Sequence, residues 1–155
     1  MARIRHIAMT TDDPAKTAEF YKQFFGLTEL FRQPKDTGEL GVWLSDGYIY
    51  FAILKFGSPG TPNLGPGHTS TLRGLHHIGF EVENQAAVME ALEAANVPPL
   101  LEPGDGQQPM LQHSRAHNAK YLGPDAVQFD VRERGWNEAI QSKMQLYTLT
   151  PVRGS

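Results

Sequence analysis

The chain has 155 residues with 14 basic and 17 acidic side chains, a length that predicts one folded unit and a charge balance that argues against a nucleic-acid partner. The absence of cysteine excludes disulfides, thiolate metal ligands and a cysteine nucleophile. The N-terminus has no long apolar run, which predicts no signal peptide, no membrane span and a cytoplasmic protein.

Residues 1–56 are predicted to form a module with the order strand, helix, strand, strand, strand. The expected strands span 4–10, 28–32, 40–44 and 48–56. Asp13 and Pro14 are typical of the N-cap and the first position of a helix, and Gly26 is typical of its end.

A segment rich in glycine, proline, serine and threonine, 57–73, is the predicted linker to a second module over 74–134. The second module is expected to repeat the order, with a helix at 85–96 capped by Asn84 and strands at 75–83, 100–102, 114–122 and 126–132. The tail, 135–155, is apolar in places and is interpreted as a helix packed on the body. The predicted fold class is α+β, with two pseudo-symmetric βαβββ modules in one functional domain.

The two modules begin with the same short sequence. Residues 5–9, Arg-His-Ile-Ala-Met, recur as residues 76–80, His-His-Ile-Gly-Phe, at an offset of 71 positions (77 minus 6). Self-similarity at a fixed offset is typical of a duplicated supersecondary unit. The repeat therefore places one imidazole, that of His6 or His77, at the same position in each module.

Strand side chains alternate between the two faces of a sheet, and this alternation groups the polar residues. Ile78 and its apolar neighbours would pack under the helix, so His77 should point to the opposite face, and His6 should do the same in the first module. The alternation places Asp130 of the last strand on that face too. We therefore expect these three polar side chains to face one cavity.

His117 and Tyr121 are predicted to line the same cavity only if the turn before the last strand is short. If the turn at Pro124 and Asp125 is a two-residue loop, Tyr121 opposes Gln128 and the side chains of His117 and Tyr121 join the same cavity wall. A bulge at this turn would reverse part of that assignment.

Two imidazoles and one carboxylate form the 2-His-1-carboxylate set, which suits Fe(II), Mn(II) and similar divalent ions, with zinc or nickel as further options. The predicted ligands are His6, His77 and Asp130. The equivalent position of the first module lies near Phe51 or Ala52, which cannot bind a metal, so three protein ligands would leave positions open for substrate.

Three further residues, His117, Tyr121 and His76, are assigned relative to the predicted metal site. His117 and Tyr121 are the candidate acid and base beside the metal. His76 is interpreted as a non-ligand at the edge of its strand.

With these residues in place, the chain resembles the vicinal oxygen chelate superfamily, which includes glyoxalases, bleomycin-resistance proteins and extradiol dioxygenases. The resemblance covers about residues 3–134 and rests on the two repeated strand starts, on Asp13-Pro14, and on the segment 123–131, GPDAVQFDV. It implies an incomplete barrel around a divalent metal, a homodimer, and His6, His77 and Asp130 as ligands. Asp130 stands where the family usually has glutamate, which would imply an altered geometry, a water-bridged ligand or a lost metal.

The reaction stays open between several alternatives. The lack of a ligand from the last strand of the first module is similar to ring-cleaving dioxygenases and fosfomycin-resistance proteins, so ring cleavage of a small oxygenated substrate is slightly favoured. A metal-dependent lyase, isomerase or thiol-transfer resistance enzyme is the first alternative. A metal-free protein that binds a small molecule against Trp43, Tyr48, Tyr50 and Tyr121 is the second.

Overall fold

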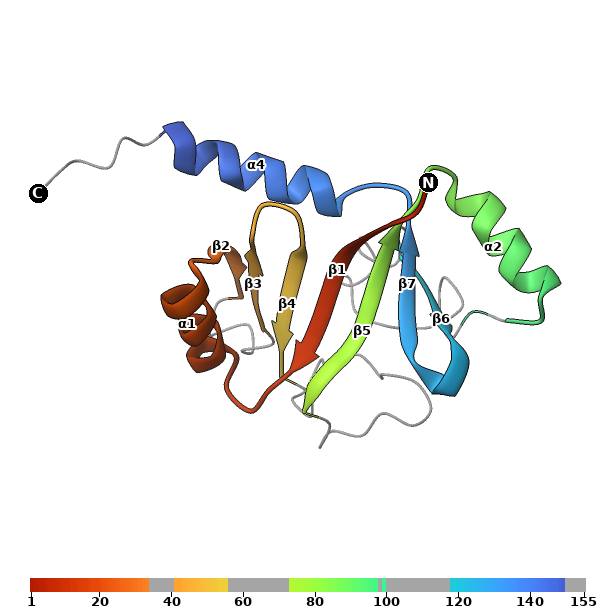
Figure 1. The fold of residues 1–155 in the computed structure, drawn as a ribbon, viewed down its shortest axis with the longest axis horizontal. Coiled ribbons are helices and arrows are strands. Elements are labelled where there is room, and N and C mark those ends of the chain that lie inside the picture. The colour runs from red at the N-terminus through yellow and green to blue at the C-terminus, as the bar shows by residue number, and fades with distance from the viewer. Residues whose placement is uncertain (34–40, 56–72, 98, 100–117, 150–155) are drawn as a thin grey trace, which may run out of the picture.

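The computed structural model describes residues 1–33, 41–55, 73–97, 99 and 118–149 (Figure 1). The predicted strand at 100–102, nearly all of the predicted linker, and His117 lie outside these residues. In chain order the described elements are β1 (Arg3–Thr10), α1 (Pro14–Phe25), β2 (Thr28–Arg32), β3 (Gly41–Ser45), β4 (Tyr50–Leu54), β5 (Gly74–Glu81), α2 (Gln85–Ala94), β6 (Ala119–Leu122), β7 (Gln128–Arg132) and α4 (Trp136–Leu149).

Both predicted N-caps are confirmed. The Asp13 carboxylate accepts a hydrogen bond from the backbone N–H of Lys16 at 2.9 Å, and the Asn84 side chain accepts one from Ala87 at 2.9 Å. These bonds satisfy backbone donors that have no partner within the first turn of a helix. Gly26 ends α1 with φ of 66°, a left-handed conformation that costs glycine little. Among the described helices, none has the length and apolar character needed to cross a membrane.

The described strands form one open mixed sheet in the order β2-β3-β4-β1-β5-β7-β6 (Figure 1). β1 and β5 are antiparallel neighbours at its centre, and each has a parallel partner from its own module, β4 for β1 and β7 for β5. The two halves are thus related by pseudo-symmetry about the β1–β5 pair. The predicted α+β fold with paired modules is confirmed.

Each central strand carries a β-bulge at the corresponding place. Arg5 of β1 has no partner in the β1–β5 register, because Ile4 pairs with Phe80 and the next pair is His6 with Gly79. His76 of β5 is likewise skipped between Leu75 and His77. A bulge turns the extra residue toward the face of its neighbour. Arg5 and His76 are accordingly both buried beside His6 and His77.

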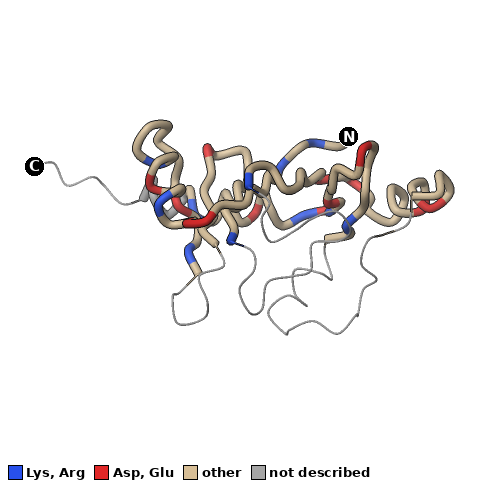
Figure 2. The backbone as a smooth tube through the Cα atoms, turned by 90° about the horizontal axis from the view of Figure 1, so that it is seen from below, with Lys and Arg blue, Asp and Glu red and all other residues tan. Residues whose placement is uncertain are grey.

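The apolar core lies on one face of the sheet, in two clusters. The first joins Ala18 of α1 to Val42, Leu44 and Ile53. The second lies under α2 and is built on Val82, Tyr121 and Val131. Because both clusters lie on one face of the sheet, α1 and α2 cover that face and leave the face with the histidines to other elements. Basic and acidic residues are interspersed along the described backbone (Figure 2).

Helix α4 begins on that opposite face, and the predicted helical tail is confirmed. Its first residue, Trp136, is buried, and so is Ile140 one turn later. Gly79 allows this close packing, because a Cβ atom there would lie 2.5 Å from the Trp136 ring and 2.7 Å from Cβ of His6. We infer that any larger residue at position 79 would push the start of α4 away from the sheet.

The connection between β6 and β7 is not the two-residue turn on which the placement of His117 and Tyr121 depended. Residues Pro124–Ala126 form a short 3-10 turn in which Asp125 and Ala126 have positive φ, and Gly123 bonds to the carbonyl of Val127. The turn is one residue longer than predicted, and the register is shifted by one. Tyr121 therefore opposes Phe129 instead of Gln128.

Candidate metal centre

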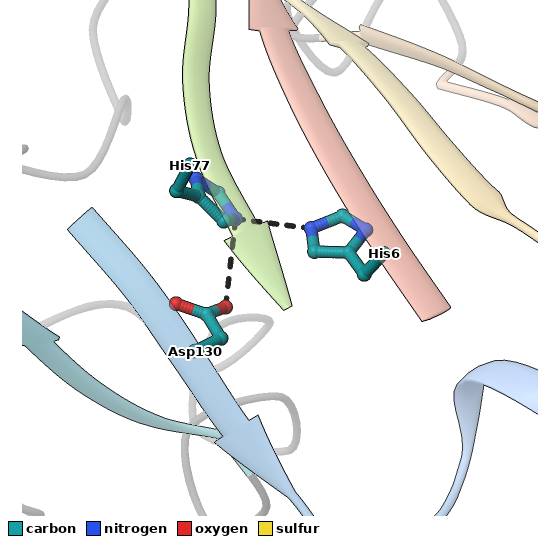
Figure 3. A group of neighbouring side chains, drawn as sticks. All are labelled: His6, His77 and Asp130. Atoms are coloured by element: carbon teal, nitrogen blue, oxygen red, sulfur yellow. Dashed lines mark hydrogen bonds and ion pairs between the residues drawn. The ribbon is translucent and has the colours of Figure 1, made fainter. Parts of the chain in front are cut away.

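The side chains of His6, His77 and Asp130 converge on one another from three strands (Figure 3). They lie on the face of the sheet opposite the two apolar clusters that pack under α1 and α2. The Nε2 atoms of the two histidines are 3.0 Å apart, and Nε2 of His77 lies 3.5 Å from Oδ2 of Asp130. One ligand atom from each residue lies within 4.8 Å of the others. The three side chains that the sequence predicts as ligands are therefore brought together by the fold.

Three adjacent strands position these side chains. His6 lies on β1, His77 on β5 and Asp130 on β7, where Asp130 is paired with Gly79. The corresponding pair in the first module is Ala8 with Ala52. Ala52, one of the two positions that the sequence suggested, is thus the counterpart of Asp130, and its methyl group offers no ligand.

The His6 ring is fixed on two sides. Its Nδ1–H donates to the carbonyl oxygen of Tyr50 at 2.7 Å, which leaves the lone pair of Nε2 for the site. The Trp136 ring stacks on it with centroids 5.0 Å apart and an interplanar angle of 18°. Burial lowers the pKa of His6 from 6.5 to about 4, against the opposing charge of Asp130. The imidazole is therefore neutral at physiological pH, as a metal ligand must be.

The lowered pKa of His6 predicts a pH dependence for the metal-free protein. Between about pH 6.5 and pH 4 the unfolded chain binds a proton at His6 that the folded chain does not. The free energy of unfolding is therefore not reduced by His6 above this window, and it falls by about 3 kcal/mol as the pH is lowered through it. Denaturant titrations with a chelator present would measure this loss. The variant His6→Asn keeps an N–H donor near the Tyr50 carbonyl but cannot titrate. If its stability falls over the same window as steeply as that of the wild type, the assignment to His6 is wrong.

His77 contacts a neighbouring histidine. Its Nδ1 lies 2.6 Å from Nδ1 of His76, and the two rings are nearly perpendicular. The sequence placed His76 at the edge of the strand, whereas the structure places it within β5, at the bulge and buried.

Asp130 is almost fully buried, and both of its oxygens have polar neighbours. Oδ1 accepts from the ammonium of Lys120 at 2.6 Å, and Nδ2 of Asn118 lies 3.4 Å from Oδ2. Lys120 is directly opposite Asp130 in the β6–β7 register. The sequence did not predict Lys120 at the site, because a two-residue turn would place its side chain on the other face of the sheet. The longer turn, with its Gly-Pro-Asp sequence, is the signal that could have found it.

The two predicted acid–base residues have different outcomes. Tyr121 lies in the apolar cluster under α2, with its ring stacked on Phe129 at 5.5 Å, so its predicted place in the cavity was wrong. His117 lies outside the described residues. Tyr50 instead shares the face of His6, with ring centroids 5.7 Å apart, and burial raises the pKa of its phenol. Tyr50 was named only as a wall of the metal-free alternative.

The ligand spacing fits a divalent ion. Two atoms that each lie ~2.1 Å from one metal are at most ~4.2 Å apart. The separations of 3.0 and 3.5 Å satisfy this limit, and the third needs a movement of no more than ~0.6 Å. Two imidazoles and a carboxylate are also the donor set that Fe(II) and Mn(II) accept. The residues present therefore fit such an ion.

Comparison with known proteins gives the same fold. A variant of the methylmalonyl-CoA epimerase of Streptomyces coelicolor, in complex with 2-nitronate-propionyl-CoA, matches with a TM-score of 0.57 and 22% identity over 86% of this chain and 94% of its own. The epimerase of Mycobacterium tuberculosis matches with 0.56 and 12% over 85% and 87%. A variant of the 4-hydroxymandelate synthase of Streptomyces coelicolor matches with 0.58 and 15% over 84% of this chain and 36% of its own.

Comparison of the sequence identifies a family but no individual curated relative. None of the curated proteins matches this chain. The profile of the Glyoxalase/Bleomycin resistance protein/Dioxygenase superfamily, however, matches residues 3–125, which is most of the chain. The chain therefore belongs to the Glyoxalase/Bleomycin resistance protein/Dioxygenase superfamily.

Proposed function

We propose that this protein is a divalent-metal-dependent enzyme that acts on a small organic substrate with two neighbouring oxygen atoms. The single observation that carries the proposal is the convergence of His6, His77 and Asp130 within 4.8 Å on one buried face. The ion would be held by Nε2 of the two histidines and Oδ2 of Asp130. When bound, it would supply Lewis acidity and, as Fe(II), the capacity to activate O2.

The surrounding residues prepare the site for such a substrate. Ala52 leaves the first-module side without a fourth ligand. Trp136 covers the His6 ring and keeps water from that side. Lys120 pairs with Oδ1 of Asp130 and leaves Oδ2 for the ion. The phenol of Tyr50, whose pKa is raised by burial, keeps its proton and can donate a hydrogen bond to a substrate oxygen.

Within this proposal, ring-cleaving dioxygenase chemistry is favoured over lyase or isomerase chemistry, because the ligand set has three members and leaves several positions open. A homodimer in the cytoplasm is the expected working form. The test begins with protein purified without a histidine tag, whose metal content is measured by mass spectrometry. It is then loaded with Fe(II) without oxygen and assayed with a panel of catechols.

We expect about one ion per chain and oxygen uptake with at least one catechol, both absent in Asp130→Asn. A protein that binds the ion but consumes no oxygen with any catechol would exclude ring cleavage and favour the lyase or isomerase. A protein that binds no divalent ion would exclude the metalloenzyme.

A metal-free binding protein is the second candidate, and one observation favours it. The ammonium of Lys120, 2.6 Å from Oδ1, already balances the buried charge of Asp130. In addition, the Nε2 atoms of His6 and His77 are at hydrogen-bond distance from each other without an ion. Such a protein would bind its ligand equally well with and without a chelator, whereas the proposed enzyme would lose affinity for a catechol when the ion is removed.

A further inference from the structure

The bulge in β5 gives His77 a partner that a regular strand would not supply. Adjacent residues of a regular strand point to opposite faces, so His76 and His77 would normally lie apart. Here His76 is the extra residue between the pairs of Leu75 and His77, and its Nδ1 lies 2.6 Å from Nδ1 of His77. Both rings are buried.

The first module uses the corresponding bulge differently. Its extra residue, Arg5, turns its guanidinium away to the Tyr48 carbonyl and to the face of the Tyr48 ring, at 3.1 and 3.8 Å. The Nδ1–H of His6 is held instead by the backbone carbonyl of Tyr50. The two candidate ligands are thus oriented by unlike groups, one by the main chain and the other by a side chain.

We propose that His76 is a positioning residue for the metal ligand His77. In the ligating form, Nε2 of His77 carries its lone pair, so its proton is on Nδ1 and is donated to Nδ1 of His76. This bond fixes the rotation of the His77 ring and keeps Nε2 directed at His6 and Asp130, from which it lies 3.0 and 3.5 Å. A partner on the distal nitrogen of a ligating histidine commonly contributes ~10–100-fold to metal affinity. The proposal rests on the proposed metal-dependent function.

The test compares three variants in Co(II) titrations followed by visible absorption. His76→Leu removes the acceptor, whereas His76→Asn keeps an oxygen near the place of Nδ1. Arg5→Met is the matched control, because it replaces the side chain of the extra residue in the equivalent bulge of β1, and that side chain contacts Tyr48 and not the ring of His6. We expect Co(II) affinity to fall ~10–100-fold in His76→Leu, to be largely restored in His76→Asn, and to stay within about 3-fold of the wild type in Arg5→Met.

A second readout is independent of affinity and of activity. In Co(II)-loaded wild type in H2O, the Nδ1–H protons of His6 and His77 should give two shifted proton resonances that exchange slowly with solvent. One should be lost or exchange rapidly in His76→Leu and should return in His76→Asn. Co(II) binding and both resonances unchanged in His76→Leu would overturn the positioning role alone. A wild-type protein that binds no Co(II) would overturn the proposed function, and the positioning role with it.

Discussion

Replacing His77 with alanine is expected to lower the affinity for Mn(II) or Co(II) by more than ~100-fold. This exceeds the ~10–100-fold loss that is typical when only a hydrogen-bond partner of a metal ligand is removed. His77 lies between the other two ligands, with its Nε2 3.0 Å from that of His6 and 3.5 Å from Oδ2 of Asp130. Without it, the two remaining ligands hold an ion weakly. Competition titration against a coloured chelator would measure the loss.

The fold should survive this change, because His77 belongs to neither apolar cluster. Circular dichroism with chelator present would check this. Tyr121→Phe is the matched control: Tyr121 was expected in the cavity but packs under α2, so its variant should keep wild-type affinity. Wild-type metal affinity in His77→Ala would remove His77 from the ligand set.

Replacing Lys120 with methionine is expected to strengthen metal binding while weakening the metal-free protein. The ammonium lies 2.6 Å from Oδ1 of Asp130, so its charge opposes that of any cation held by the other oxygen. A like charge at ~4 Å costs up to ~4 kcal/mol near a protein surface, so the gain in affinity should be at least ~10-fold. The measurement is a Mn(II) titration by calorimetry.

The metal-free variant should lose roughly 2–3 kcal/mol, less than for a fully buried pair, because Asp130 is left buried while Lys120 is a quarter exposed. Added Mn(II) should therefore raise the melting temperature of Lys120→Met more than that of the wild type. Lys143→Met, on the exposed side of α4, is the control and should change neither quantity. Weaker Mn(II) binding in Lys120→Met would mean that Lys120 supports the ligand carboxylate more than it repels the ion.

Much of the fold was predictable because its determinants are local or repeated. The caps at Asp13 and Asn84 and the stop at Gly26 are set by the chemistry of single residues, and the structure confirms all three. The duplicated strand start fixed the pairing of the two modules. Strand alternation was then enough to bring His6, His77 and Asp130 to one face.

The predictions that were wrong depend on backbone irregularities, which the alternation of strand side chains does not reveal. One added residue in the turn after Leu122 moved Tyr121 into the core and put Lys120 beside Asp130. The bulge at His76 reversed the facing of a residue that a regular strand would send to the other side. Both errors concern the neighbours of the ligands, whereas the ligands themselves lie on regularly paired positions.

The most direct test of the metal centre is an anomalous difference map from crystals grown with Mn(II). We expect one strong peak per chain, about 2.0–2.2 Å from Nε2 of His6, Nε2 of His77 and an oxygen of Asp130. A map with no peak among these three side chains at saturating Mn(II), or with its strongest peak elsewhere, would contradict the metal centre.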